Sequence, residues 1–139
     1  MRIVVDSYAW IELFLGSKKG SKAREILTES KEVYTPDFVL AEIARKYFRE
    51  GIDQQTILER LRKISESSDV TPISVESALE SAKCYFELKE KSREAGISAP
   101  SLFDAMVLAM ARVLKAKVVT GDKHLKNLNE TLWLTNGKS

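Results

Sequence analysis

Short runs of β-branched residues without polar alternation are the feature that most limits how this chain can fold. The first run, Ile3, Val4 and Val5, leads directly into Asp6. A strand that is apolar on both faces is typical of a parallel sheet whose two faces are both covered. Further short strands are predicted over residues 33–35, 70–73, 117–120 and 131–134. We therefore expect a central sheet that is buried on both sides.

Segments with apolar residues at helical spacing alternate with these strands. Helices are expected around residues 10–14, 23–27, 40–48, 57–64, 75–86 and 102–114. Gly16 ends the first helix, Thr35 is a candidate N-cap of the third, and Pro36 suits its first position. The helix over residues 102–114 is apolar in nearly every direction, so it should be buried on more than one side. The alternation predicts one α/β domain over residues 1–139 with a mostly parallel sheet.

Composition and charge narrow the class of protein. With 139 residues and 44% hydrophobic content, the chain suits a single domain with a substantial core. The 22 basic and 20 acidic side chains leave a formal charge of +2, which argues against disorder and against a uniformly basic nucleic-acid coat. Cys84 is the single cysteine, so neither an intrachain disulfide nor a cysteine-rich zinc site is expected. Because no apolar run reaches about 18 residues, we expect a soluble, cytoplasmic protein without a membrane anchor.

Four acidic residues stand near the edge of the sheet where such folds bind ligands. Asp6 follows the first predicted strand, and Asp122 follows the fourth. Glu42 and Asp104 lie near the N-termini of helices that would face the same edge. In open α/β sheets the binding crevice lies beyond the carboxyl ends of the strands. We therefore predict that the four acids share one cleft.

Three of these acids also have structural explanations that need no ligand. Asp6 suits the N-cap of the helix that follows it. Asp122 follows Gly121 and suits a turn or a cap. Ser101 and Asp104 have the spacing of a capping box, with Asp where Glu or Gln is more usual. A shared site is therefore one of two interpretations for each residue.

The environment expected for Asp104 favours a bound cation. Glu42 precedes Arg45 and Lys46 at ion-pair spacing, and such a surface pair is worth only about 0.3–0.5 kcal/mol. Asp104, in contrast, is the only acid in an apolar helix, and burying it without compensating charge costs several kcal/mol. A hard divalent ion removes the repulsion among clustered carboxylates, and oxygen ligands select Mg²⁺ or Mn²⁺ over zinc. Such ions activate water and stabilise a phosphate under attack.

Segments around all four acids resemble the motifs of the PIN-domain nucleases, and especially the short VapC-type toxins of toxin–antitoxin pairs. The resemblance spans almost the whole chain and rests on residues 4–11, 40–43, 101–109 and 118–122. It implies a five-stranded sheet with strand order 3-2-1-4-5, flanked by helices. It also implies a Mg²⁺- or Mn²⁺-dependent endoribonuclease that cleaves single-stranded or structured RNA.

The resemblance also assigns roles to individual residues. The implied metal and catalytic residues are Asp6, Glu42, Asp104 and Asp122. Glu42 would position or activate the attacking water. Ser7 and Thr120 would not bind the ion themselves but would orient its ligands or a water molecule through hydrogen bonds. Many relatives have a further acid two residues after the last Asp, but His124 stands there in this chain. The number of metal ions, one or two, is therefore left open.

Basic residues near the last motif are candidates for contacts with an RNA backbone. They are Lys117, Lys123, His124 and Lys126. The alternative is that the lysines are solvated surface and that His124 is an exposed residue on a short helix. A phosphate contact or help with proton transfer is the other role open to His124.

The resemblance implies protein partners as well. VapC-type toxins are usually homodimers inhibited by an antitoxin segment that lies in a hydrophobic groove. Trp10 and Phe14 are the first candidates for that groove. The simpler interpretation makes both of them, with Tyr47 and Phe48, core residues at helical spacing.

Two other functions remain compatible with the sequence. One is a catalytically silent RNA-binding scaffold with the same fold. The other is an aspartyl phosphotransfer protein, because Asp6 follows a central strand. The phosphatase version of that function needs a second Asp two positions later, where this chain has Tyr8.

Overall fold

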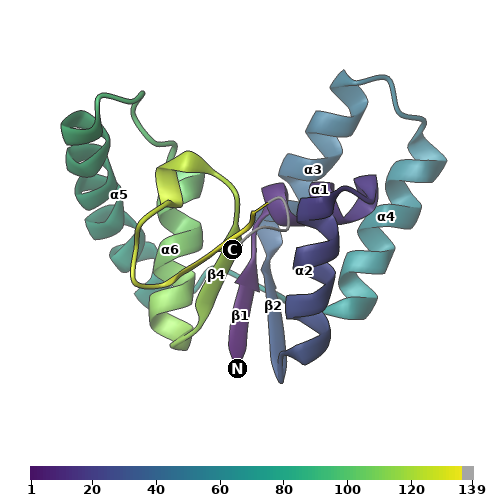
Figure 1. Ribbon diagram of the computed structural model, residues 1–139, viewed down its shortest axis with the longest axis horizontal. Helices are drawn as coiled ribbons and strands as arrows, with labels where there is room; N and C mark the ends of the chain where they lie inside the picture. Colours follow the sequence, from purple (N-terminus) through teal and green to yellow (C-terminus); the bar gives the residue numbers. More distant parts are fainter. Residues whose placement is uncertain (136–139) are drawn as a thin grey trace.

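The computed structural model describes residues 1–135 and contains a five-stranded parallel sheet between two layers of helices (Figure 1). The strands are β1 (Arg2–Val5), β2 (Glu32–Pro36), β3 (Asp69–Thr71), β4 (Lys117–Thr120) and β5 (Thr131–Trp133). Their order is β3-β2-β1-β4-β5, and every pairing is parallel. The predicted fold class and strand order are therefore confirmed.

Six α-helices and one short 3-10 helix connect the strands. They are α1 (Ser7–Leu15), α2 (Lys18–Glu29), α3 (Asp37–Arg49), α4 (Gln54–Ser67), α5 (Val75–Ala95), α6 (Leu102–Leu114) and the 3-10 helix η1 (Lys123–Leu125). Helices α5 and α6 cover one face of the sheet, and α1 to α4 lie on the other (Figure 1). None of the helices within residues 1–135 has both the length and the apolar character that a membrane crossing needs.

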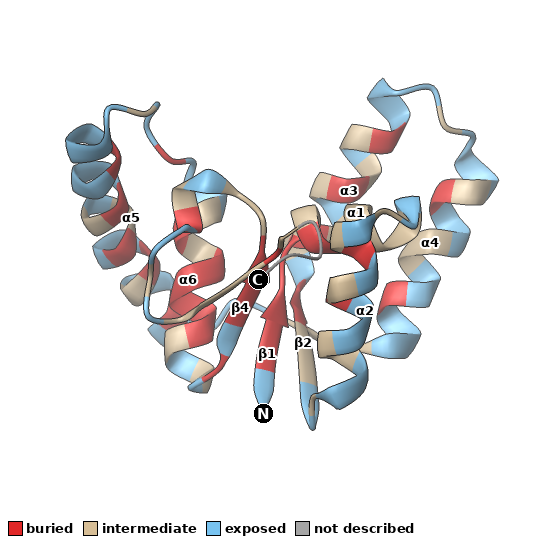
Figure 2. Cartoon of the chain, viewed as in Figure 1, coloured by how far each residue is buried: buried red, intermediate tan, exposed pale blue. Residues whose placement is uncertain are grey.

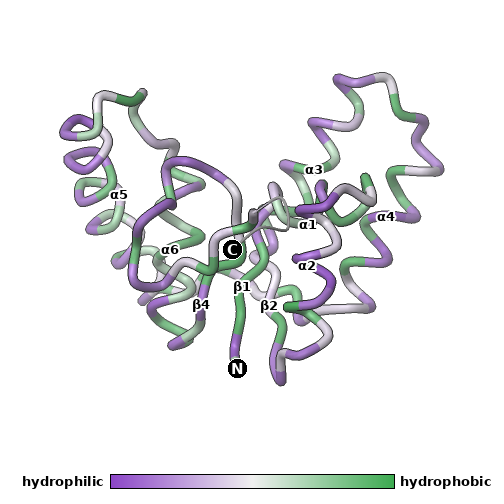
Figure 3. Tube along the Cα trace, viewed as in Figure 1, coloured by the Kyte–Doolittle hydropathy of each residue, from purple (hydrophilic) through white to green (hydrophobic). Residues whose placement is uncertain are grey.

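Strand β1 explains why the sheet is buried on both sides. Ile3 and Val5 point into the core formed with α1 to α4, whereas Val4 points into the core formed with α5 and α6. All three are fully buried (Figure 2). Figure 3 shows the hydrophobic stretch along β1. An apolar residue at each position is what this two-sided burial requires.

The predicted ends of α1 are confirmed, and the predicted cap of α3 is wrong. Asp6 caps α1 through a bond from Ala9 N–H to Oδ1 (2.9 Å), and Gly16 ends α1 in the left-handed conformation with φ of 69°. Thr35 does not cap α3. It lies in β2, α3 begins at Asp37, and Pro36 occupies the cap position without a side-chain bond.

Thr35 instead joins three elements through a buried hydroxyl group. Its Oγ1 accepts a hydrogen bond from Nε1 of Trp10 on α1 (3.1 Å) and lies 2.7 Å from Oγ of Ser68 at the end of α4. Trp10 is 1% exposed and Thr35 is fully buried. The indole nitrogen is thereby satisfied inside the core, as a buried donor must be.

Two predictions of burial are corrected by the structure. Phe48 is 57% exposed, because it lies on the outer side of α3 near its C-terminus, while Tyr47 is buried as predicted. In α6 the central residues are buried, but Leu102, Phe103 and Val113 are at least 38% exposed. The helix is therefore enclosed only along its middle turns.

Replacing Thr35 with Val tests the buried hydroxyl. Valine keeps the shape but removes the acceptor for Trp10, so an indole N–H is left unsatisfied in the core. We expect a loss of about 1–3 kcal/mol in the free energy of unfolding, measured by urea denaturation. The control Thr28→Val, at an exposed position on α2, should change stability by less than about 0.5 kcal/mol. Equal effects of the two substitutions would contradict the assignment.

Candidate metal and nuclease site

The parallel pairing of β1 with β4 brings Asp6 and Asp122 to the same edge of the sheet. Val5 pairs with Val119, so Asp6 and Thr120 are the next residues on the two strands. The hydroxyl group of Thr120 donates to Oδ2 of Asp6 and accepts the backbone N–H of Asp122 (2.9 Å). Thr120 is fully buried and therefore links the two acidic positions, as its predicted supporting role requires.

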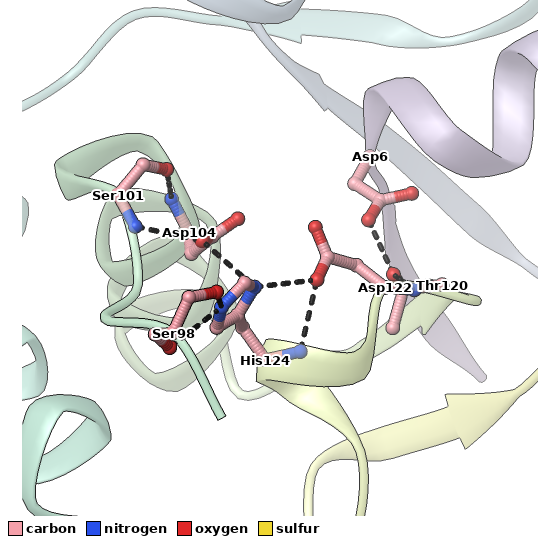
Figure 4. Close-up of polar contacts among 7 residues, drawn as sticks. All are labelled: Asp6, Ser98, Ser101, Asp104, Thr120, Asp122 and His124. Atoms are coloured by element: carbon pink, nitrogen blue, oxygen red, sulfur yellow. Dashed lines mark hydrogen bonds and ion pairs between the residues drawn. The ribbon is translucent and has the colours of Figure 1, made fainter. Parts of the chain in front are cut away.

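Asp104 reaches this edge from the first turn of α6. It forms the predicted capping box: Ser101 N–H donates to Oδ2 of Asp104 (2.9 Å), and Asp104 N–H donates to Oγ of Ser101 (3.1 Å). Figure 4 shows Asp104 and Asp122 on either side of His124, with Asp6 at the start of α1. One ligand atom from each of Asp104, Asp122 and His124 lies within 4.8 Å of the others.

The structural explanations of these three acids are correct, and their functional role stays a prediction. Asp6 and Asp104 cap helices, and Asp122 accepts the backbone N–H of His124 (2.9 Å) at the start of η1. Among residues 1–135, Oδ1 of Asp104 and Oδ2 of Asp122 receive no hydrogen bond. Each of these two carboxylates therefore keeps one oxygen for a ligand.

Glu42 lies on the second turn of α3 and is half-buried. The alternative ion pair with Lys46 is not formed, because Lys46 bonds instead to Glu50 (2.8 Å). The pKa of Glu42 is raised to about 7, mainly by burial and also by the negative charges of Asp104 and Asp122, which Arg45 partly offsets. Glu42 therefore faces the same acids that were predicted to share its cleft.

The pKa values of the other acids indicate that all four carboxylates interact. The pKa of Asp6 is raised to about 7, mainly by burial and also by the charges of Asp122 and Glu42, against the lowering effect of the hydrogen bonds from Thr120 and Ala9. Burial also raises the pKa of Asp104, followed by repulsion from Asp122. Mutual repulsion and desolvation both favour a neutralising cation.

This donor set fits a hard divalent ion. It consists mainly of carboxylate oxygens, the ligands that Mg²⁺ and Mn²⁺ prefer. We call Asp6, Glu42, Asp104 and Asp122 the acidic site. The imidazole of His124 is the one nitrogen donor within reach among the described residues.

His124 is held between two acceptors and is not the exposed residue that the simpler interpretation predicted. Its side chain is 14% exposed. Nδ1 lies 3.0 Å from Oδ1 of Asp122 and 3.7 Å from Oδ2 of Asp104, and Nε2 lies 3.0 Å from the carbonyl oxygen of Ser98. Because carbonyl and carboxylate oxygens accept hydrogen bonds, both ring nitrogens have an acceptor within hydrogen-bond distance.

Comparison with known families shows to which family the chain belongs. A family model described as the PIN domain matches residues 3–130. The chain belongs to the PIN domain family. This membership confirms the resemblance seen in the four motifs and favours a nuclease over an aspartyl phosphotransfer protein. No curated protein matches the sequence.

Solved structures that share the fold of this PIN domain include components of toxin–antitoxin systems. A toxin–antitoxin complex from Klebsiella pneumoniae is 18% identical, with a TM-score of 0.69 over 96% of this chain and 97% of that chain. VapBC2 from Rickettsia felis, bound to a DNA fragment from their promoter, is 15% identical, with a TM-score of 0.68 over 96% and 97%. A sarcin–ricin loop cleaving VapC toxin from Mycobacterium tuberculosis is 18% identical, with a TM-score of 0.57 over 87% and 90%.

The predicted basic residues divide between the two ends of the sheet. Lys123, His124 and Lys126 line a cleft of about 520 Å³ between η1 and the end of α5. Lys91 also contributes to it, together with one acid, Glu94; because the basic residues outnumber this acid, we call it the basic cleft. Lys117 is the first residue of β4, and its Nζ donates to the carbonyl oxygen of Asn129 (2.8 Å). It therefore lies at the end of the sheet opposite the acids, about 10 Å along the strand from Thr120. It is not close to the other residues predicted to contact an RNA backbone.

Two further hollows of this PIN domain lie along α1. A groove of about 390 Å³ between α1, α2 and α4 is lined by Leu13, Phe14 and Leu27, with Trp10 as its nearly inaccessible floor. Trp10 is thus a core residue that offers a partner little surface.

A second cleft, of about 410 Å³, contains Ser7, Tyr8 and Asp122. The contribution of Tyr8 was not predicted, because one aromatic residue at helical spacing carries no signal of its own.

The raised pKa values predict how metal-free protein responds to pH. The folded protein keeps the protons of Asp6 and Glu42 up to about pH 7, whereas the unfolded chain loses them near the ordinary values of 3.8 and 4.5. The folded state therefore binds more protons in this window, and stability falls as pH rises through it. With a chelator present, we expect the melting temperature measured by circular dichroism to fall between about pH 5 and about pH 8.

Three comparisons check this explanation. Asp6→Asn, which keeps a good N-cap, should flatten the pH dependence, whereas Glu66→Gln on the exposed side of α4 should not. Millimolar Mn²⁺ should restore most of the stability lost at the higher pH, because the ion neutralises the ionised acids. A melting temperature that stays constant or rises with pH in metal-free protein would rule the explanation out.

Proposed function

We propose that this PIN domain is a Mg²⁺- or Mn²⁺-dependent endoribonuclease that cleaves single-stranded or structured RNA. The observation that carries the proposal is the meeting of four carboxylates at one edge of the sheet, where burial and mutual repulsion raise the pKa values of Asp6, Glu42 and Asp104. Such a cluster is costly for the fold unless a cation joins it. Membership of the PIN domain family supports a nuclease as the function.

The residues of the acidic site divide between two proposed roles. Asp6, Asp104 and Asp122 would hold the ion. A bound Mg²⁺ or Mn²⁺ supplies charge that stabilises the phosphate and lowers the pKa of water. Glu42, whose pKa is about 7, can accept a proton from the attacking water near neutral pH. Thr120 keeps Asp6 in place by its hydroxyl bond, and Ser7, at the start of α1, remains a candidate for orienting water.

The basic cleft supports RNA as the substrate. Lys91, Lys123 and Lys126 can contact phosphate groups of a strand that passes the acidic site. His124 lies at the boundary, since it lines this cleft and also contacts Asp122. The proposed path therefore leads from the scissile phosphate into the lysine-lined cleft.

We further propose that the chain acts as the toxin of a toxin–antitoxin pair in the cytoplasm. The support is the shared fold with toxin–antitoxin complexes from two organisms. The groove beside Leu13, Phe14 and Leu27 is apolar and open, and it suits an apolar antitoxin segment. Arg24 and Lys63 on the same groove would favour acidic residues in that segment.

Cleavage of RNA by the purified protein is the direct test. We expect cleavage with Mg²⁺ or Mn²⁺ and none with a chelator. Asp104→Asn should lower the rate at least about 100-fold, because the loss of supporting contacts to a metal already costs 10–100-fold. The control Glu66→Gln should keep the wild-type rate. Full activity of a folded Asp104→Asn variant would remove Asp104 from the site, and metal binding without any cleavage would favour the silent RNA-binding scaffold.

The outer face of α5 is the proposed surface of a homodimer. Val75, Leu79 and Phe86 are 89%, 64% and 67% exposed, and their helical spacing places them along one side of this helix. Small residues, Ala78 and Ala82, lie between them on the same side. In an antiparallel pair of α5 helices, Phe86 of one copy can therefore lie over the alanines of the other. A self-complementary apolar stripe of this kind suits a twofold interface.

Phe86→Glu should abolish that dimer, because it replaces the aromatic residue that packs on the alanines of the other copy with a charged one. Light scattering during gel filtration should give the mass of a dimer for the wild type and of a monomer for the variant. Lys91→Glu, on the same helix but outside the stripe, should remain dimeric. A wild-type monomer at micromolar concentration would refute the proposed interface.

A further inference from the structure

The cleft between α1 and α3 continues directly from the acidic site. It has a volume of about 410 Å³, and Asp122 forms part of its wall. Half of the remaining lining residues are aromatic or aliphatic, namely Tyr8, Ile11, Leu15 and Tyr47, and the other half are polar or charged, namely Ser7, Glu12, Lys46 and Glu50. This volume lies in the range of small-ligand sites, about 300–1,000 Å³. We call it the aromatic cleft.

Tyr8 is held rigidly at the inner end of the aromatic cleft. A Cβ atom at Gly121 would lie 2.3 Å from Cε1 of Tyr8, so the ring occupies space that only glycine leaves free. On α2, Nζ of Lys19 donates to the phenolic oxygen (2.9 Å) and lies 5.4 Å from the ring centroid. Tyr8 is thus fixed two residues after Asp6 and against the residue that precedes Asp122. An aromatic ring fixed in advance binds with little loss of conformational freedom.

The remaining lining of the aromatic cleft suits a flat heterocycle with polar edges. Leu15 is 68% exposed, which leaves an apolar surface at the rim. Lys46 and Glu50 provide a donor and an acceptor on the α3 side. Single-stranded nucleic acids bind by stacking bases on such aromatic residues beside a charged track for the backbone. The basic cleft on the His124 side of the acidic site is such a track.

We propose that the aromatic cleft binds the nucleobase adjacent to the scissile phosphate, stacked on Tyr8, so that the preferred substrate is single-stranded RNA with an unpaired base at that position. This inference rests on the proposed nuclease function. A phosphate at the acidic site would place its neighbouring base at Asp122, where the aromatic cleft begins. A base in a duplex could not enter the cleft without leaving its stack, so paired RNA should be cleaved poorly.

Binding and fluorescence with a short labelled RNA test the stacking on Tyr8. The protein carries Asp104→Asn to prevent cleavage, and the RNA carries 2-aminopurine at one position at a time around the mapped cleavage site. Fluorescence should be quenched at the one position that enters the cleft. Tyr8→Leu should abolish that quenching and weaken binding by about tenfold, as measured by fluorescence anisotropy. Tyr8→Phe, which keeps the ring, should preserve both.

An RNA that lacks the base at the quenched position gives a test that needs no change in the protein. It should bind the Asp104→Asn protein with intact Tyr8 about tenfold more weakly, and Tyr8→Leu should not weaken it further. If the wild type cleaves RNA but shows no quenching and binds the abasic strand equally well, this inference is overturned and the proposed function stands. If the protein neither cleaves nor binds the strand, both are overturned.

Discussion

The parallel pairing of β1 with β4 is the interaction on which the rest of the structure depends. It places Asp6 and Thr120 side by side at the carboxyl edge, and the buried hydroxyl of Thr120 then bonds to Asp6 and to the backbone of Asp122. The crossover helices on both faces of the sheet bring Glu42 and Asp104 to the same edge. Without this pairing Asp6, Asp104 and Asp122 would be separate helix caps, each satisfied by its own backbone.

The acidic site combines structural and chemical duties in the same side chains. Asp6 and Asp104 use carboxylate oxygens to cap α1 and α6, and Asp122 caps η1. The caps hold the carboxylates in fixed directions, so less freedom is lost when a ligand binds. The cost is electrostatic, since carboxylates that are buried together raise one another's pKa values. A cation can offset this cost, so stability and proposed function are expected to depend on the same ion.

The two sides of the acidic site differ in chemistry. On one side His124 and three lysines form the basic cleft, and on the other Tyr8 and its apolar neighbours form the aromatic cleft. His124 also places positive charge, when both ring nitrogens donate, beside Asp122 and Asp104. A single strand whose backbone follows one side and whose base enters the other would fit this asymmetry.

The sequence alone determined the fold class, the strand segments and the identity of the four acids. Uninterrupted apolar strands and helix caps are local signals, and residues such as Val4 and Asp6 carry them. Tertiary structure decided which side chains meet and which are buried. Thr35 looked like a cap but became a buried acceptor for Trp10, and His124 is enclosed through Ser98. These outcomes depend on contacts between distant segments, which no local pattern encodes.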